Sequence, residues 1–596
     1  MLTFPCISGP QDRAARIVFT AVLLSATWPQ FVARSAETAP EQSSSSASRP
    51  NVILIVTDDQ GYGDIGFHGN SIVKTPNLDR LASQSLRLID FHVDPTCSPT
   101  RAALMTGRYS CRTGVWHTIM GRSILRGDET TMAEYFARAG YATAMFGKWH
   151  LGDNAPYRPI DRGFQHALCH GGGGIGQTPD YWGNTYFSPM LRNDGNWEPS
   201  QGYCTDVFFA GAREFIAQHR DHPFFVYLPT NVPHGPWQVD DRYAAPYRAA
   251  GVSKDLANFY GMLTNFDENL GGFLASLDEW DLARNTLVIF MTDNGTAGNG
   301  FNAGMRGRKG SPYDGGHRVP CFLRWPDRWS QPRDVPGLTA HIDLLPTLIE
   351  LCNLPKEGGM PLDGVSLCPI LDGKSGGDPD RTIFVQVNRI EHPVPWRLSS
   401  VLTPRYRLIN GNELYDIVED PGQNHDIASA QPDLVQQLRS RYEGWYRDVS
   451  SRFGEYVPLV LGTAQENPAL LTCHDWHGEK IPWDQTMISR GADGNGFWAV
   501  EFSRSGEYRI TLRDRPPYVS HPLAGRRARL VIGDQEWVRD IPPGAQAVEF
   551  RVNQAAGPTR VQTFLMDGDT ELRGAYFVEV AYLDGEASSE AEPQSP

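Results

Sequence analysis

The first half of the chain alternates between short apolar runs and longer stretches with helical periodicity. A run as continuously apolar and β-branched as Asn51–Thr57 is typical of a strand buried on both faces of a parallel sheet. Alternation of strands and helices predicts an α/β domain in which helices sandwich a large, mainly parallel sheet. The predicted strands are 51–57, 141–146, 224–228 and 286–292, and the predicted helices are 131–139, 206–218 and 253–280.

The pattern changes twice after this domain. Near residue 380 shorter β-like runs, 382–387 and 396–409, precede a helix near 433–447, which indicates a smaller α+β lobe. Farther on, short strands bounded by Gly, Pro or Asp follow one another, as in an antiparallel all-β sandwich. We therefore expect an α/β domain at 50–375, a smaller lobe at 376–455 and a C-terminal β-sandwich module at 470–584.

The two ends of the chain have the patterns of segments outside the fold. Arg13 and Arg16 precede an apolar run, Ile17–Trp28, and a small-residue stretch follows it, as in a secretory signal. The run is shorter than the roughly 20 residues that span a bilayer, so we expect no stable membrane insertion. We predict a signal peptide at 1–36, a Ser-rich linker at 37–49, a disordered tail at 585–596, and a secreted or periplasmic protein.

Composition narrows the class of protein. With 40% hydrophobic and 21% charged residues, the 596-residue chain is neither a coiled coil, a collagen-like fibre nor a wholly disordered chain. A net charge of -15 argues against a general nucleic-acid binder, which needs a basic surface. The nine cysteines include no CxxC pair, which disfavours a disulfide scaffold or a zinc ribbon, and their odd number leaves at least one thiol unpaired.

Acidic clusters follow two of the predicted strands. Asp58 and Asp59 come directly after the first strand, and Asp293 and Asn294 follow the strand that ends more than 230 residues later. In an open α/β sheet, ligands bind beyond the carboxyl ends of the strands, so both clusters can lie at one edge. Their oxygen atoms suit Ca²⁺ or Mg²⁺, although each cluster taken alone also fits an ordinary turn.

A cysteine in a distinctive setting is the strongest chemical signal. Cys97 lies in the segment Pro95–Gly107, where Arg101 and a helix start would favour a thiolate, although a structural cysteine is the commoner interpretation. The pattern Cys-x-Pro-Thr-Arg followed by Leu-Met-Thr-Gly closely resembles the signature of the type I sulfatases, members of the alkaline phosphatase superfamily. In that family a maturation enzyme oxidises the motif cysteine to formylglycine, so the resemblance implies that Cys97 is modified.

Further segments resemble the same family over roughly residues 50–450. The segment Gly140–Gly152 is similar to the second family signature, with Phe146 where a smaller aliphatic residue is usual. The resemblance implies an alkaline phosphatase-like fold and one Ca²⁺ ion, with Mg²⁺ as the alternative. It implies Asp58, Asp59, Asp293, Asn294 and the modified Cys97 as metal ligands, and Arg101, Lys148, His150, His234 and Lys309 as the other catalytic residues.

The resemblance also implies a mechanism. A hydroxyl of the Cys97-derived aldehyde hydrate attacks sulfur, while His234 or Lys309 protonates the leaving oxygen. Lys148 and Arg101 hold the hydrate and the sulfate, and His150 then removes the proton of the second hydroxyl so that sulfate is eliminated. Fixed positive charge is needed in such a site, because the nucleophile must approach an anionic ester.

We therefore expect an arylsulfatase-like sulfuric ester hydrolase that acts on sulfated small molecules or polysaccharides. The alternatives are a phosphodiesterase or phosphonate monoester hydrolase of the same superfamily and a noncatalytic glycan-binding protein. The Gly-rich and aromatic stretch 171–184 can line a sugar pocket or form an ordinary loop. Likewise, the C-terminal sandwich can bind carbohydrate or simply pack, with its aromatic residues in its core.

Overall fold

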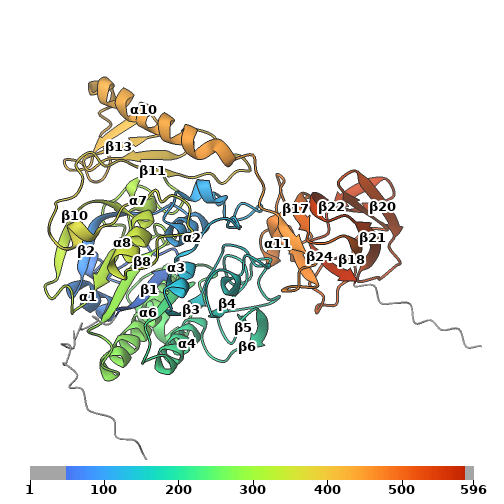
Figure 1. The fold of residues 1–596 in the computed structure, drawn as a ribbon, viewed down its shortest axis with the longest axis horizontal. Coiled ribbons are helices and arrows are strands. Elements are labelled where there is room, and N and C mark those ends of the chain that lie inside the picture. The colour runs from blue at the N-terminus through green and yellow to red at the C-terminus, as the bar shows by residue number, and fades with distance from the viewer. Residues whose placement is uncertain (1–48, 584–596) are drawn as a thin grey trace, which may run out of the picture. The chain divides into compact units, whose positions relative to one another are not determined.

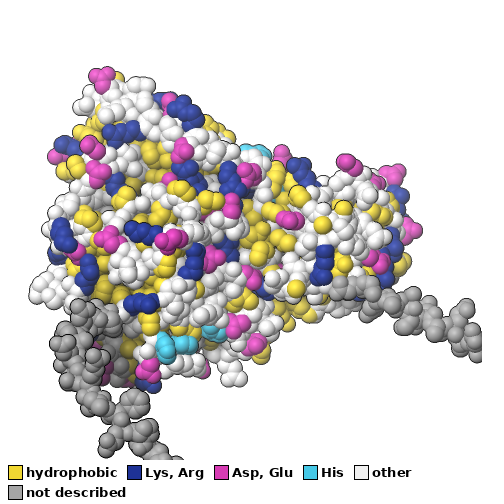
Figure 2. All heavy atoms as spheres, viewed as in Figure 1, with side chains coloured by type: hydrophobic (Ala, Val, Ile, Leu, Met, Phe, Trp, Pro, Cys, Tyr) yellow, Lys and Arg dark blue, Asp and Glu magenta, His cyan; other side chains and the backbone are white. Residues whose placement is uncertain are grey.

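The structure is a computed structural model that describes residues 49–583. The predicted signal peptide and disordered tail, and all of the predicted linker but Arg49, lie outside these residues and remain predictions. Among the described residues, no helix has both the length and the apolar character needed to cross a membrane. Figure 2 shows Lys, Arg, Asp and Glu side chains interspersed on the face in view, so the net negative charge is not gathered into one patch there.

A ten-stranded sheet forms the centre of the α/β domain (Figure 1). Strand β1 (Asn51–Thr57) lies between β7 (Phe224–Pro229) and β8 (Thr286–Thr292) and is parallel to both. Strand β3 (Ala142–Gly147) is parallel to β7, whereas β9 (Cys321–Arg324) is antiparallel to its neighbours, so the sheet is mixed around a parallel centre. The order is β10-β2-β9-β8-β1-β7-β3-β4-β5-β6, with β2 Leu86–His92, β4 His166–Cys169, β5 Met190–Asn193, β6 Asn196–Pro199 and β10 Arg333–Ala340.

Helices cover both faces of this sheet. Successive side chains of a strand point to opposite sides, so a strand that is apolar throughout needs a packing partner on each face. In β1, Val52, Leu54 and Val56 pack into one apolar core, and Ile53 and Ile55 into the other. The predicted α/β fold class is therefore confirmed. The first core takes in residues of α2 (Cys97–Thr106), α3 (Met132–Arg138) and α8 (Leu344–Leu351), and the second those of α1 (Pro76–Ser83), α4 (Cys204–Gln218) and α6 (Lys254–Glu279).

The smaller lobe is a four-stranded antiparallel sheet covered by a long helix, α10 (Pro432–Val449). The prediction of a single β-like run at 396–409 is wrong, because the structure divides this segment into two strands. The peptide N–H of Thr403 donates to the carbonyl of Tyr406, and Pro404 lies inside the resulting hairpin turn. The strands are β11 Ile383–Gln386, β12 Ser399–Leu402, β13 Tyr406–Ile409 and β14 Glu413–Asp416.

The C-terminal region contains two sheets that share one apolar core, as predicted for a sandwich. Trp498, Tyr508 and Tyr576 are fully buried in this core, so they are packing residues. The first sheet takes in β15 (Leu459–Leu461), which lies ahead of residue 470. Its other strands are β17 Phe497–Phe502, β22 Gly557–Asp567, β19 Arg527–Ile532, β20 Gln535–Asp540 and β23 Thr570–Arg573, and the second sheet is β16 Ala469–Thr472, β24 Phe577–Leu583, β18 Gly506–Arg513 and β21 Val548–Gln554.

A buried arginine joins the smaller lobe to the α/β domain. Arg407 of β13 is fully buried, and its guanidinium pairs with Asp90 of β2 at 2.8 Å and with Asp314 of α7 (Asp314–His317) at 3.0 Å. Burial opposes ionisation, but the Arg407 and His92 side chains hold the pKa of Asp90 well below its usual range. Both carboxylates therefore pair with a cation supplied by the other lobe, and Asp90 also pairs with His92 and Arg318 of its own domain.

We expect Arg407→Met to lower the free energy of unfolding by about 3–5 kcal/mol, because it leaves two buried carboxylates without their partner. Arg405→Ala is the matched control, since Arg405 pairs with Asp416 at the surface and such pairs contribute about 0–1 kcal/mol. Denaturant unfolding of both variants measures the difference. Equal, small effects would show that Arg407 is not needed to neutralise the junction.

Candidate functional site

The carboxyl ends of four neighbouring strands carry most of the predicted site. Strands β8, β1, β7 and β3 are adjacent in this order, and Thr57 at the end of β1 is in register with Thr292 at the end of β8. The two acidic clusters that follow these residues therefore lie side by side. Lys148 and His150 follow β3, and His234 lies in the loop that follows β7.

The acidic clusters form a buried group of oxygen atoms. Ligand atoms of Asp58, Asp293 and Cys97 lie within 4.8 Å of one another, and those of Asp58, Asp59 and His234 form a second such group. The Oδ1 atoms of Asp58 and Asn294 are buried and have no hydrogen-bond partner among the described residues. Buried oxygens without partners in a carboxylate-rich cluster fit a hard cation such as Ca²⁺ or Mg²⁺.

Three cationic side chains neutralise the three carboxylates. Lys148 Nζ lies 2.6 Å from Asp58 Oδ2, and Lys309 Nζ lies 2.5 Å from Asp59 Oδ1. The Arg101 guanidinium contacts Asp293 Oδ2 with two nitrogens, at 2.8 and 3.1 Å. Its third nitrogen donates to the Lys148 carbonyl at 2.7 Å, so all three guanidinium nitrogens of Arg101 contact protein atoms.

The ionisation of the carboxylates reflects this crowding. Burial and the neighbouring Asp58 carboxylate raise the pKa of Asp293 to about 6, although Arg101 and Lys148 act in the opposite direction. Burial also acts to raise the pKa of Asp59, but Lys309, His234 and Lys148 hold it well below its ordinary value. The repulsion between Asp58 and Asp293 is the kind that a bound divalent cation offsets.

Cys97 is the first residue of helix α2, and its Sγ atom lies 3.4 Å from His150 Nδ1. The other ring nitrogen of His150, Nε2, lies 2.9 Å from the Thr118 carbonyl, which can only accept a hydrogen bond. Nε2 therefore carries the proton, and Nδ1 presents its lone pair to position 97. Burial has the largest effect on the pKa of His150 and, together with the neighbouring Lys148 and His474, lowers it well below 6.5. The ring is therefore neutral and able to accept a proton.

His234 and Lys309 both lie next to the Asp59 carboxylate. The Nδ1 atom of His234 lies 2.7 Å from the Gly235 carbonyl, and Nε2 lies 3.9 Å from Asp59 Oδ2. Burial, with Lys148 and Lys309, lowers the pKa of His234 to about 3 despite the opposing effect of Asp59. Burial alone would lower the pKa of Lys309, but the neighbouring Asp59, Cys97 and Asp58 side chains raise it above its ordinary value. Lys309 is thus the group of the two that holds its proton at neutral pH.

A cavity of about 380 Å³ opens onto these groups. Arg101 and Lys148 do not line it, since both are buried next to the carboxylates. Five of its residues belong to no motif and were missed by the sequence analysis, and only the folded chain brings them to Cys97: His117, Thr118, Ile119, Arg389 and Trp483. The lining residues are Cys97, His117, Thr118, Ile119, His150, Gln177, His234, Lys309, Arg389 and Trp483.

The Gly-rich stretch forms part of this wall. Gln177 lines the cavity, and its side-chain oxygen accepts a hydrogen bond from the Gly173 N–H at 2.8 Å. A Cβ atom on Gly173 would lie 2.2 Å from His150 Cε1, so only glycine permits this approach to the histidine ring. The stretch is thus a loop, of which Gln177 lines the cavity, and its role in binding a sugar remains a prediction.

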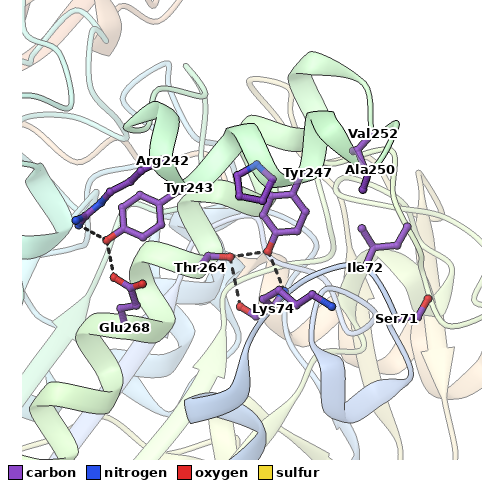
Figure 3. Close-up of a pocket in the computed structure, with 11 residues that line it drawn as sticks. Ser71, Ile72, Lys74, Arg242, Tyr243, Tyr247, Ala250, Val252, Thr264 and Glu268 are labelled. Atoms are coloured by element: carbon purple, nitrogen blue, oxygen red, sulfur yellow. Dashed lines mark hydrogen bonds between the residues drawn. The ribbon is translucent and has the colours of Figure 1, made fainter.

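A second cavity, of about 440 Å³, lies between helix α6, helix α5 (Asp241–Ala249) and the loop before α1 (Figure 3). The Tyr247 hydroxyl pairs with Thr264 at 2.6 Å and accepts from the Lys74 N–H at 2.9 Å. The Tyr243 hydroxyl donates to Glu268 at 2.7 Å. The two tyrosine hydroxyls are thus engaged by neighbouring groups, and none of the motif residues lines this cavity.

Comparison with known proteins agrees with this geometry. The model of the family described as Sulfatase matches residues 50–354, and that described as N-sulphoglucosamine sulphohydrolase, C-terminal, matches residues 309–445. Human arylsulfatase A is 31% identical over 500 residues, which cover 72% of this chain and 93% of the relative. Human N-acetylgalactosamine-6-sulfatase is 31% identical over 369 residues, which cover 56% and 68%.

A solved structure shows the same architecture. The structure of Ps i-CgsB in complex with k-i-k-neocarrahexaose superposes with a TM-score of 0.62 at 27% identity, and covers 69% of this chain and 95% of that one. The matched segments contain all the motif residues, including Cys97, both acidic clusters and Lys309. The chain therefore belongs to the sulfatase family of sulfuric ester hydrolases, within the alkaline phosphatase superfamily.

Proposed function

We propose that this sulfatase hydrolyses sulfate monoesters of carbohydrates, with formylglycine at position 97 and one Ca²⁺ ion. The observation that carries the proposal is the placement of Cys97 between the His150 Nδ1 lone pair and the buried carboxylates. The carbohydrate substrate is supported by the relatives, since one is named as an N-acetylgalactosamine-6-sulfatase and another was solved with neocarrahexaose.

Asp58, Asp59, Asp293, Asn294 and residue 97 would hold the metal ion, as the unpartnered oxygens of Asp58 and Asn294 support. When bound, Ca²⁺ would polarise the sulfate oxygens and favour the ionised hydroxyl at position 97. Arg101 touches Asp293 and the Lys148 carbonyl, so we assign it the role of a positioning residue for these two groups. Direct contact of Arg101 with the sulfate is implied by the family resemblance alone, since its three guanidinium nitrogens contact protein atoms and the residue does not line the cavity.

Two groups would move protons in this reaction. The formylglycine hydrate supplies the nucleophilic hydroxyl, and the neutral His150 would accept a proton from position 97 through Nδ1. Lys309 would protonate the leaving oxygen, because it retains its proton at neutral pH and lines the cavity. His234 donates its Nδ1 proton to the Gly235 carbonyl, so its Nε2 would donate to the sulfate in the protonated ring, a form that a bound anion favours.

Conversion of Cys97 would have to precede folding. The residue is 3% exposed at the start of a helix in which every residue is buried, so an enzyme cannot reach its sulfur in the folded chain. We therefore propose that a formylglycine-generating enzyme acts on the unfolded chain, and that the N-terminal signal directs the protein to a secreted or periplasmic location.

The phosphodiesterase and phosphonate hydrolase activities are tested by assaying those esters alongside sulfates.

We expect protein made together with the maturation enzyme to contain formylglycine at position 97 and to release sulfate from 4-nitrophenyl sulfate. Mass spectrometry of the tryptic peptide that contains residue 97 measures the conversion. Cys97→Ala is expected to lower kcat on the order of 10³-fold or more, as when a nucleophile is removed. Cys111→Ala, at another buried cysteine, is the control. Full activity of Cys97→Ala would exclude this mechanism.

Removal of divalent ions by a chelator is expected to abolish activity, and Ca²⁺ is expected to restore it. A ligand at about 100 times its Kd stabilises the folded state by about 2.7 kcal/mol, so Ca²⁺ should also raise the Tm of the chelated protein. Asn294→Ala should weaken both effects, whereas Asn412→Ala, at an exposed position, should not. A Tm and an activity that do not respond to Ca²⁺ would contradict the assignment of this ion.

The leaving group distinguishes Lys309 from His234. A poor leaving group needs protonation, so Lys309→Ala should lower kcat roughly 10²–10⁴-fold on a sugar sulfate and far less on 4-nitrophenyl sulfate. His234→Asn should affect both substrates to a similar extent, since it removes a sulfate contact. Rates on both substrates measure the split, and the reverse pattern would make His234 the proton donor.

A further inference from the structure

We propose that Trp483 and Arg389 form a second binding site for the substrate, next to the reactive centre. Trp483 would stack against the apolar face of the sugar ring that carries the scissile sulfate, and Arg389 would bind a second anionic group on the same saccharide, a sulfate or a carboxylate. The proposal rests on the proposed sulfatase function at residue 97. It goes beyond that function because it defines which carbohydrates the enzyme prefers.

Trp483 comes from the C-terminal region and lies outside both family-matched segments, 50–354 and 309–445. It is 40% exposed and lines the cavity, whereas Trp476 and Trp498 of the same region are fully buried. A large apolar side chain kept in contact with water at the mouth of a polar site is typical of a ligand-binding surface. Its indole provides a flat, apolar face beside the reactive centre.

The backbone around Trp483 is held rigidly against the Gly-rich stretch. The Thr178 N–H donates to the Trp483 carbonyl at 3.0 Å, and the Thr178 hydroxyl donates to the Pro482 carbonyl at 3.1 Å. Gln485, in helix α11 (Gln485–Ser489), donates from Nε2 to the carbonyls of Gln177 and Asp180 at 3.0 and 3.1 Å. The C-terminal region therefore positions both Trp483 and Gln177, which line the same cavity.

Arg389 supplies a cation that the reaction at residue 97 does not use. It lines the cavity from the loop after β11, is exposed, and has no carboxylate partner among residues 49–583. Burial, with the charges of Arg389 and Arg397, lowers the pKa of His117 to about 3, so His117 is neutral and Arg389 is the arginine that lines the cavity. The planar guanidinium matches the geometry of a sulfate or a carboxylate.

The loop that carries Arg389 is anchored immediately after it. The Trp116 indole N–H donates to the Ile390 carbonyl at 3.2 Å. Glu391 pairs with Arg122 at 3.0 Å and with His477, in the C-terminal region, at 2.9 Å. These contacts hold the backbone that follows Arg389, so less conformational entropy is lost when its unpaired guanidinium binds an anionic group.

The test compares saccharides that differ by one anionic group. The probes are carrageenan disaccharides with one and with two sulfates, and monosulfated chondroitin and heparin disaccharides with the uronate carboxylate intact or reduced to an alcohol, together with 4-nitrophenyl sulfate. Arg389→Ala, Arg389→Lys and Trp483→Ala are assayed with two matched controls that do not line the cavity. These controls are Arg447→Ala, at an exposed arginine of the smaller lobe, and Trp537→Ala, at a partly exposed tryptophan of the sandwich.

The wild-type enzyme should prefer the doubly anionic form of its best disaccharide. Arg389→Ala should lower kcat/KM for that form roughly tenfold to hundredfold, the value of a hydrogen bond to a charged group, and change that for 4-nitrophenyl sulfate less than about twofold. Arg389→Lys should restore part of the loss. Trp483→Ala should raise KM for both saccharide forms roughly two- to tenfold, with kcat little changed.

Two outcomes separate this proposal from the proposed function. If the wild-type enzyme releases no sulfate from any ester, the function at residue 97 is wrong. If it is active but shows no preference for a second anionic group, or if Arg389→Ala impairs 4-nitrophenyl sulfate as much as the disaccharides, the second binding site is wrong while the sulfatase function stands.

Discussion

Three carboxylates buried at one sheet edge are the constraint around which the site is organised. Asp58, Asp59 and Asp293 cannot remain ionised together without compensating charge, and each has a cationic partner within 2.8 Å. Only one of these cations, Lys309, also lines the cavity, whereas Lys148 and Arg101 are buried beside the carboxylates. Lys309 is therefore the cation that can both neutralise a carboxylate and face an anionic ester.

The surrounding lobes are joined to the α/β domain by hydrogen bonds and buried ion pairs. The C-terminal region holds the Gly-rich stretch through Gln485, and the Met120 N–H donates to the His474 carbonyl at 2.9 Å. The smaller lobe depends on Arg407 for its buried junction with the α/β domain. The Met120 contact lies two residues from Thr118, whose carbonyl accepts from His150 Nε2, so it helps to hold the His150 ring in position.

Much of the fold and the reactive centre could be predicted from the sequence. Continuous apolar runs identified β1, β7 and β8, because strands buried on both faces have no polar positions. The cysteine count was less useful, since all eight described cysteines are free and buried, so an odd number did not distinguish Cys97. The contacts of Arg101 were also unpredictable, because a motif specifies a residue type but not whether its charge meets substrate or protein.

By itself the sequence determined the strands, the residues that follow them and the chemical identity of the reactive groups, because these depend on local periodicity and on motifs. Only the tertiary structure decided what lies opposite Cys97. Trp483 is almost 400 residues away in sequence and Arg389 almost 300, and both line the same cavity. No local pattern reports such proximity, since it arises from the packing of three separately patterned regions around one sheet edge.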